Sequence, residues 1–349
     1  MTPEQQNDFK PMQEKIKALV RGQVGTTQGF PLDLWQDLGR KNLMGIVIPE
    51  KHGGLGLGLS RLALVTEELV ISGVTMGFAL SFLIHNLVAH HFILTHGTRE
   101  LRNAYLPGLA RGSITASVAV SEPGTGAHPK HLKTRARQQD DRVIIDGEKS
   151  FITNGPLADL FVVIAVTGKR ENRNLFSAFV VPRDTPGLVP GVPMDLPMLR
   201  PCPHNTLGLN GCTIHGTAIT GEVDRAYETM VIPFRRLEQA LGPVILSGGI
   251  RHRANALAAD LKGLVPASDL ETIAALALRT SLVAHKDVES YEKAKDPAHP
   301  LITAKKFYRC AMEFQEHALQ LTQEKKLAPS READMFDNDL NALLRLFPG

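Results

Sequence analysis

The spacing of hydrophobic residues divides the chain into three parts. The segments LALVTEELVISG and FALSFLIHNLVAHHFILTHG carry apolar residues at helical spacing. From Ile114 the pattern changes to short β-rich runs bounded by Gly, Asn and Pro, such as ITASVAV and LFVVIAVTG. Helical spacing returns after about Gly221, in TMVIPFRRLEQALGPVIL and DLETIAALALRTSLVAHKDVESYEKA. We therefore predict a helical domain over residues 1–115, a β-domain over 116–222 and a helical bundle over 223–349.

Composition narrows the class of protein. The 349 residues are 43% hydrophobic and 21% charged, as expected for a soluble globular chain with two or three packed units. Aromatic residues make up only 5%, which argues against a stacking platform for single-stranded nucleic acid. The net charge is +3 without a long run of Lys or Arg, so we expect no nucleic-acid partner.

The cysteines and the N-terminus suggest a compartment. Cys202, Cys212 and Cys310 form neither a CxxC motif nor an even set, which indicates a reducing environment. The first twenty residues are polar and charged, unlike a signal peptide, and we find no run of about 18 apolar residues. We expect a cytoplasmic protein without a membrane span.

Two apparent motifs do not carry chemistry. The glycines of GGLGLGLS (53–60) do not follow the GxGxxG spacing of a dinucleotide loop, and we interpret them as a structural turn. The histidines of HNLVAHHFILTH lack the i, i+4 spacing that places two zinc ligands on one face of a helix. We therefore predict no metal site.

Two other segments do suggest a site. The loop AVSEPGTGAHPKHLKT (119–134) combines a hydroxyl, a fixed turn and four basic or imidazole side chains. It is either a solvated surface turn or a loop that brings backbone close to a bulky anionic ligand. After a strand turn comes DGEKSFITNG (146–155).

These two segments resemble the paired signatures of the acyl-CoA dehydrogenase family, V-T-E-P-x-A-G-S-D and G-x-K-x-W-I-T-N. They stand here at 120–128 and 147–154, and the resemblance extends over about residues 40–190. Flanking segments such as YLPGLARGSITAS and FVVPRDTPGL also look like that family. The resemblance implies an α+β acyl-CoA dehydrogenase fold: an N-terminal helical domain, a central β-domain and a C-terminal helical bundle, here shortened.

The resemblance also implies an FAD cofactor. Ser121 matches the family's threonine that hydrogen-bonds the flavin ring near N5 and O4, Thr153 matches a second hydroxyl contact, and Phe151 matches an aromatic residue over one ring face. The alternatives are a turn cap for Ser121 and a core side chain for Phe151. Further cofactor contacts implied at the same strands are Val118, Val120 and Ile152.

The implied substrate contacts depart from the family pattern. Ala127 and His128 occupy the positions of the family's Ser and Asp, so the hydroxyl contact to the CoA arm is missing. His128, Lys130, His131 and Lys133 could instead offer charge to the CoA phosphates, or form a solvated basic loop.

The last third of the chain departs further. We find no R-x-x-F-G or Q-x-x-G-G-x-G segment, which the family uses for the pyrophosphate and adenosine of FAD. The family's two positions for the catalytic glutamate hold Arg235 and Pro348, and a guanidinium cannot remove a proton at neutral pH. Glu238 lies about one turn further along the same predicted helix and is either a displaced base or a surface charge.

The implied activity is FAD-dependent α,β-dehydrogenation of an acyl-CoA thioester, with electrons passed to an electron-transfer flavoprotein. The first alternative is a non-catalytic or half-site subunit of a hetero-oligomer, and the second is a divergent flavin enzyme that needs no Glu base. Because LETIAALALRTSLVAH is apolar on more than one side, we expect a homo- or hetero-oligomer, a dimer or a tetramer.

Overall fold

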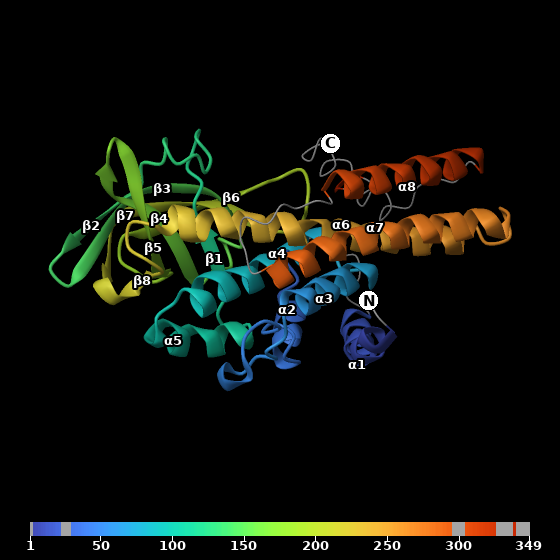
Figure 1. Ribbon diagram of the computed structural model, residues 1–349, viewed down its shortest axis with the longest axis horizontal. Helices are drawn as coiled ribbons and strands as arrows, with labels where there is room; N and C mark the ends of the chain where they lie inside the picture. Colours follow the sequence, from blue (N-terminus) through green and yellow to red (C-terminus); the bar gives the residue numbers. More distant parts are fainter. Residues whose placement is uncertain (1–2, 22–28, 295–303, 326–337, 340–349) are drawn as a thin grey trace.

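The computed structural model describes residues 3–21, 29–294, 304–325 and 338–339. A β-sheet lies at one end, and helices extend away from it along the long axis of the molecule (Figure 1). The order of helices, strands and helices confirms the predicted α+β class. The N-terminal helices are α1 (Pro3–Val20), α2 (Leu32–Arg40), η1 (Glu50–His52), α3 (Leu59–Ile71), α4 (Met76–Val88), the π-helix η2 (Ala89–Thr95) and α5 (Arg99–Ala110).

The sheet contains eight strands in the order β6-β7-β3-β2-β4-β5-β8, and β1 pairs with β4 in parallel. Most of the other neighbours are antiparallel, and β2 meets β4 in parallel at one residue pair. The strands are β1 (Ala116–Ala119), β2 (Arg135–Gln139), β3 (Arg142–Thr153), β4 (Leu160–Arg170), β5 (Arg173–Pro182), β6 (Leu188–Met194), β7 (His204–His215) and β8 (Ile219–Thr220), with the short helix η3 (Gly216–Ala218) before β8.

The side chains of β4 alternate between two hydrophobic cores. Leu160, Val162 and Ile164 pack against the core that the helices share, while Phe161 and Val163 belong to a second core inside the β-domain. This follows from the two-residue period of a strand, which sends successive side chains to opposite faces. A run that is apolar throughout is therefore the expected sequence for a strand buried on both sides.

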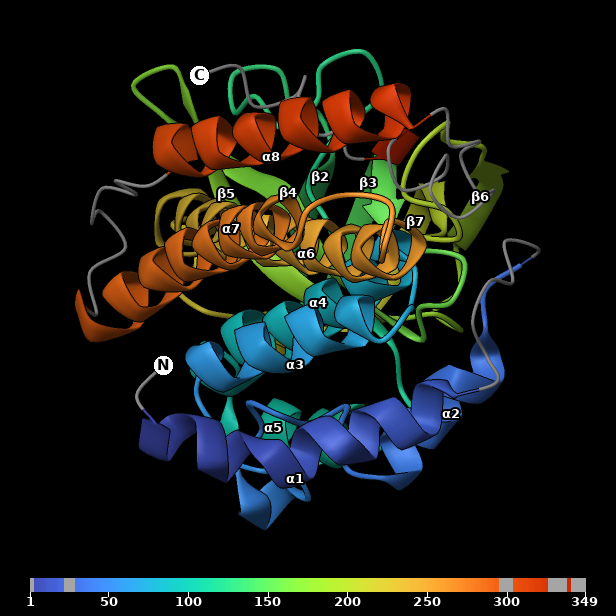
Figure 2. The ribbon, with the colours of Figure 1, turned by 90° about the vertical axis from the view of Figure 1, so that its right-hand side faces the viewer.

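The C-terminal helices extend far beyond the sheet. They are the π-helix η4 (Tyr227–Val231), α6 (Ile232–Asp260), α7 (Ala267–Ala294) and α8 (Ala304–Glu324). Figure 2 shows their layers: α8 lies outermost on α7, α6 packs between α7 and the pair α3 and α4, and α1 lies below α3. The helix α6 thus contacts the N-terminal helices along one side and the bundle along the other.

One helical stretch, Met76–Thr95, is long and apolar enough to cross a membrane by length and composition. It is not an uninterrupted apolar run, because His85, Asn86, His90 and His91 lie among its apolar residues. In the structure 83% of the most apolar 18-residue part of this stretch is buried, and the helix packs against α6 and β1. A core helix of a globular protein has this environment, and no other helix of the described ranges meets the same test.

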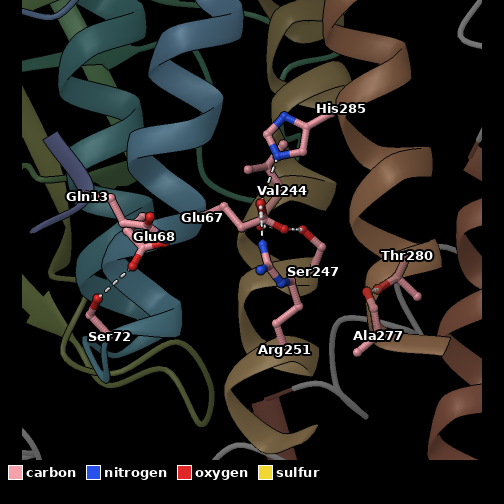
Figure 3. A network of polar contacts seen from close by, with 10 residues as sticks. All are labelled: Gln13, Glu67, Glu68, Ser72, Val244, Ser247, Arg251, Ala277, Thr280 and His285. Atoms are coloured by element: carbon pink, nitrogen blue, oxygen red, sulfur yellow. Dashed lines mark hydrogen bonds and ion pairs between the residues drawn. The ribbon is translucent and has the colours of Figure 1, made fainter. Parts of the chain in front are cut away.

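A buried polar network joins three helices (Figure 3). The carboxylate of Glu67 on α3 accepts hydrogen bonds from Ser247 Oγ at 2.7 Å and Arg251 Nη1 at 3.3 Å, both on α6, and from His285 Nε2 on α7 at 2.9 Å. Burial alone would raise the pKa of Glu67, but the hydrogen bonds and charges of these partners hold it at about 2. The network fixes how the bundle sits on the N-terminal helices.

Two further contacts set the same packing. At Gly248 of α6 a Cβ atom would lie only 2.8 Å from the side chain of Val70 on α3, so the absence of a side chain allows the two helices to approach. Glu292 of α7 accepts hydrogen bonds from the backbone N–H groups of Leu59 and Ser60, which are free donors at the start of α3.

The glycine-rich segment before α3 is a turn, as expected, with Gly53 in the left-handed region at φ 84°.

Candidate functional site

A cavity of about 310 Å³ lies where the β-domain meets α4 and the start of α6. It is lined by residues from both signature segments of the β-domain and by residues of the two helical parts. Its walls are formed by Ile84, Val118, Val120, Ser121, Ala127, Ser150, Phe151, Thr153, Val231, Phe234, Arg235 and Glu238. The structure therefore brings together two segments that the sequence separates by about 25 residues with a third segment about 80 residues later.

The two signature segments are held together by a buried ion pair. Lys149 Nζ lies 2.9 Å from Glu122 Oε1, and the two side chains are 0% and 7% exposed. The backbone N–H groups of Lys133 and Thr134 also donate to the Glu122 carboxylate, at 2.7 and 2.9 Å. Burial lowers the pKa of Lys149 to about 8, although Glu122 opposes that shift. The pair thus fixes the loop that carries Ser121 against strand β3.

Two serine hydroxyls beside the cavity have no protein partner within the described residues. The N–H of Ser150 donates to the Ser121 carbonyl at 2.9 Å, which places the two residues side by side. The Ser150 hydroxyl is buried and has no hydrogen-bond partner, and that of Ser121 has none within the described ranges. An unpaired buried hydroxyl such as that of Ser150 costs stability, and the half-buried Ser121 hydroxyl is open to a polar ligand. The loop thus contributes part of the cavity wall.

Phe151 is displayed at the mouth of the cavity. It lies at a register shift of β3 between Lys149 and Ile152, in the left-handed region at φ 54°, and is 58% exposed. Such a backbone costs on the order of 1–3 kcal/mol for a bulky residue and is found most often at functional sites. The alternative that Phe151 is a core side chain is wrong. Its neighbour Ile152 is the core residue, 1% exposed and outside the cavity walls.

Thr153 is a half-buried residue of the cavity wall and has a partner of its own. Its hydroxyl lies 3.0 Å from Nε2 of His204, the residue opposite it on β7. Its backbone carbonyl accepts a hydrogen bond from the Ser117 hydroxyl on β1. Both contacts fix the orientation of Thr153. No sequence signal pointed to His204, because it comes from a strand more than 50 residues away.

Of the two residues implied in substrate binding, Ala127 lies in the cavity wall and His128 lies outside it. Ala127 lines the cavity, and its carbonyl accepts a hydrogen bond from the Tyr227 hydroxyl at 2.8 Å. His128 is exposed outside the cavity walls, with its ring centroid 4.8 Å from that of His131. Lys130 and Lys133 are also exposed on this loop, so the basic side chains lie around the cavity rather than in it.

Glu238 and Arg235 enter the cavity from α6, one turn apart. Burial raises the pKa of Glu238 to about 7, and the charge of Arg235 opposes that shift. Glu238 is half-buried and lines the cavity, which favours the alternative of a displaced base over that of a surface charge. A carboxyl group with a pKa near 7 is suited to take up a proton at neutral pH. The other family position, Pro348, lies outside the described residues.

The described part of the segment QLTQEKKLAPS, residues 320–325, forms no phosphate loop. It completes α8, which continues as a helix to Glu324, and Lys325 follows in a turn. The backbone N–H groups of a helix interior are bonded within the helix and are not exposed to a pyrophosphate. The residues that the structure describes also contain no group of three or more His, Cys, Asp or Glu side chains arranged to hold a metal ion.

The chain thus places a cavity between N-terminal helices, a β-sheet and a C-terminal helical bundle. Two family models match within that frame. The model for the acyl-CoA dehydrogenase N-terminal domain matches residues 9–113, and the model for the middle domain of the same family matches 117–212. Together they cover more than half of the chain, which belongs to the acyl-CoA dehydrogenase family.

Named relatives agree with the family. An acyl-CoA dehydrogenase of Bacillus subtilis is 34% identical over 165 residues, which is 47% of this chain and 43% of the relative. A mitochondrial isovaleryl-CoA dehydrogenase of Solanum tuberosum is 30% identical over 225 residues, 63% of this chain and 54% of the relative. The chain thus spans about half the length of the relatives it matches.

A solved structure agrees with the fold over nearly the whole chain. Butyryl-CoA dehydrogenase from Megasphaera elsdenii superposes with a TM-score of 0.80 at 18% identity and covers 96% of each chain. At this identity the likeness shows the fold alone. The similarity in fold extends to the C-terminal helices, although the R-x-x-F-G and Q-x-x-G-G-x-G motifs of the family are missing there.

Proposed function

We propose that this protein is an FAD-dependent acyl-CoA dehydrogenase that removes the α- and β-hydrogens of an acyl-CoA thioester. One observation carries the proposal. A single cavity joins the flavin-contact positions Ser121 and Thr153 to Glu238, a carboxyl group with a pKa of about 7. Membership of the family and the named relatives support the same activity.

The cavity suits the ring end of FAD. It offers the Ser121 hydroxyl for polar atoms, the apolar side chains of Val118 and Val120, and the exposed Phe151 for one ring face. Its size is at the lower end for small-molecule sites, so it matches a ring better than the whole cofactor. FAD, when bound, supplies the acceptor for the β-hydrogen and its electron pair.

Glu238 performs the proton transfer. As a carboxylate, it accepts the proton from the α-carbon of the thioester and becomes a neutral carboxylic acid. The buried environment favours that neutral form, while Arg235 stabilises the charged form that must be present first. The two opposing effects keep the group near the pH at which a general base is most effective.

The test is the removal of this carboxylate. In Glu238→Gln, the rate at which an acyl-CoA bleaches the flavin should fall about 10² to 10⁴-fold, the usual contribution of a positioned base. Glu228→Gln is the matched control, because Glu228 is an exposed carboxylate on η4, just before α6, does not line the cavity and should leave the rate unchanged. A rate in Glu238→Gln equal to that of the wild type would overturn the assignment.

We also propose that the electrons pass to an electron-transfer flavoprotein and that the protein works in the cytoplasm. The relationship to the family supports the first, and the three unpaired buried cysteines support a reducing compartment. Reduction of a purified electron-transfer flavoprotein by the acyl-CoA-loaded protein tests the first proposal, and its absence would refute it.

A half-site subunit is the second candidate. Leu278 and Leu282 lie four residues apart on α7 and are 52% and 54% exposed, so they form an apolar face on the outside of the bundle. The residues that follow α8 in the described range offer no glycine loop for a pyrophosphate. A partner chain that covers α7 and supplies that loop explains both observations. Rescue of slow flavin reduction by a paralogous chain would favour this candidate.

A further inference from the structure

Thr153, in the cavity wall, forms a polar pair with His204 behind it. They are opposite each other on the antiparallel strands β3 and β7, and Thr153 Oγ1 lies 3.0 Å from His204 Nε2. The other ring nitrogen, Nδ1, lies 3.1 Å from the backbone carbonyl oxygen of Cys202. The imidazole is 8% exposed, so both contacts are shielded from water.

The carbonyl fixes the tautomer of the ring. A carbonyl oxygen only accepts hydrogen bonds, so Nδ1 of His204 must carry a proton. Burial lowers the pKa of His204 below its usual 6.5, so the ring is neutral at pH 7 and carries no second proton. Nε2 therefore has a free lone pair and accepts the hydrogen bond from the Thr153 hydroxyl.

This fixes what Thr153 offers to a ligand. A hydroxyl has one proton and two lone pairs, and the proton of Thr153 points to His204. Its oxygen thus presents only lone pairs to the cavity. The hydroxyls of Ser121 and Ser150 have no protein partner within the described residues and remain free to donate.

We propose that His204 is a positioning residue that makes Thr153 an obligate hydrogen-bond acceptor and so favours the reduced form of the bound flavin. The inference rests on the proposed function, because it takes the flavin ring as the occupant of the cavity. Reduction adds an N–H donor to the reacting end of a flavin ring. A fixed acceptor pairs with that donor, whereas a rotating hydroxyl could also donate to the oxidised ring. His204 thereby raises the tendency of the flavin to take up electrons.

The experiment measures the midpoint potential of the flavin in the purified holoprotein. In His204→Leu, Thr153 is free to donate, and the ratio of affinities for reduced and oxidised FAD should fall about tenfold, which is about 30 mV for a two-electron couple. His204→Gln keeps an acceptor oxygen near Nε2 and should stay close to the wild type. An unchanged potential in a folded, flavin-loaded His204→Leu protein would overturn the proposal.

A second measurement does not depend on flavin. Nitrogen-15 NMR of the imidazole distinguishes the two neutral tautomers, and we expect the proton of His204 on Nδ1 in the flavin-free protein. A proton on Nε2 would overturn the proposal, because Thr153 would then donate to the cavity. If the protein binds no flavin, the proposed function fails, while the tautomer still shows whether Thr153 is an acceptor.

Discussion

At the scale of single residues, the site depends on a carboxyl group whose environment adjusts its proton affinity. Glu238 is half-buried in the cavity wall; this burial raises its pKa to about 7, and the charge of Arg235 opposes that rise. The base must be ionised to accept a proton. The rate of flavin reduction should therefore rise with pH through about 7 and level off above it.

The same pair predicts the direction of a mutational shift. Arg235→Gln removes the positive charge that favours the Glu238 carboxylate, so the pKa of Glu238 should rise and the rising limb of the pH–rate profile should move to higher pH. Arg225→Gln is the control, because Arg225 is exposed and pairs with Glu222. A limb that stays in place, or moves to lower pH, would show that Glu238 is not the titrating base.

Several residues of the cavity wall could be predicted from the sequence, whereas others depend on contacts that only the structure shows. Ser121 and Thr153 lie in short signatures whose local geometry places them on one wall of the cavity. For Glu238 the sequence left two alternatives open, because helical spacing alone does not say which face of α6 meets the β-domain. His204 was missed entirely, since the register of β3 against β7 brings it to Thr153. Long-range pairing of this kind has no local signal.

At the scale of elements, the cavity depends on how two β-segments are joined. The loop before β2 has few apolar side chains, and its position is set by the Glu122–Lys149 pair and two backbone donors. The two residues belong to the two signatures, so the ion pair explains why an acid and a base occur at these positions. A buried charge that loses its partner is far more costly than the pair itself.

This asymmetry leads to a test by double substitution. Glu122→Gln or Lys149→Met alone should lower the free energy of unfolding by about 3–5 kcal/mol, because each leaves one buried charge unpaired. The double variant should recover a large part of the loss. Urea unfolding of the four proteins measures the coupling. Effects of the single variants that simply add in the double variant would contradict a direct pair.

The helices were easier to predict than the details of the sheet. The long helices α6 and α7 follow directly from their apolar spacing, and the predicted turn before α3 is present. The left-handed backbone of Phe151 could not be predicted, because the register shift that causes it comes from the pairing of β3 with β7. The aromatic side chain of Phe151 was predicted from the sequence, but its exposure at the cavity follows from the pairing of β3 with β7.

At the scale of the whole molecule, the helical bundle exposes an apolar surface on α7 to solvent. The exposed Leu278 and Leu282 on α7 are large apolar residues in a helix whose other face packs on α6 and α8. We expect a second chain to cover them and the protein to sediment as a dimer or larger assembly. Leu278→Glu together with Leu282→Glu should shift it toward the monomer. A wild-type protein that is a stable monomer at micromolar concentration would contradict this.

The central claim is that the cavity between β-domain and helices holds the flavin ring, and the most direct measurement is the flavin bound per chain. Replacing both Ser121 and Thr153 by Ala removes a donor hydroxyl and an acceptor hydroxyl, each contact worth on the order of 1 kcal/mol, so the affinity for reduced FAD should fall about tenfold to thirtyfold. Thr272→Ala, on the exposed side of α7, is the control and should bind FAD as the wild type does. Equal affinity for reduced FAD in the double variant and the wild type would contradict the account.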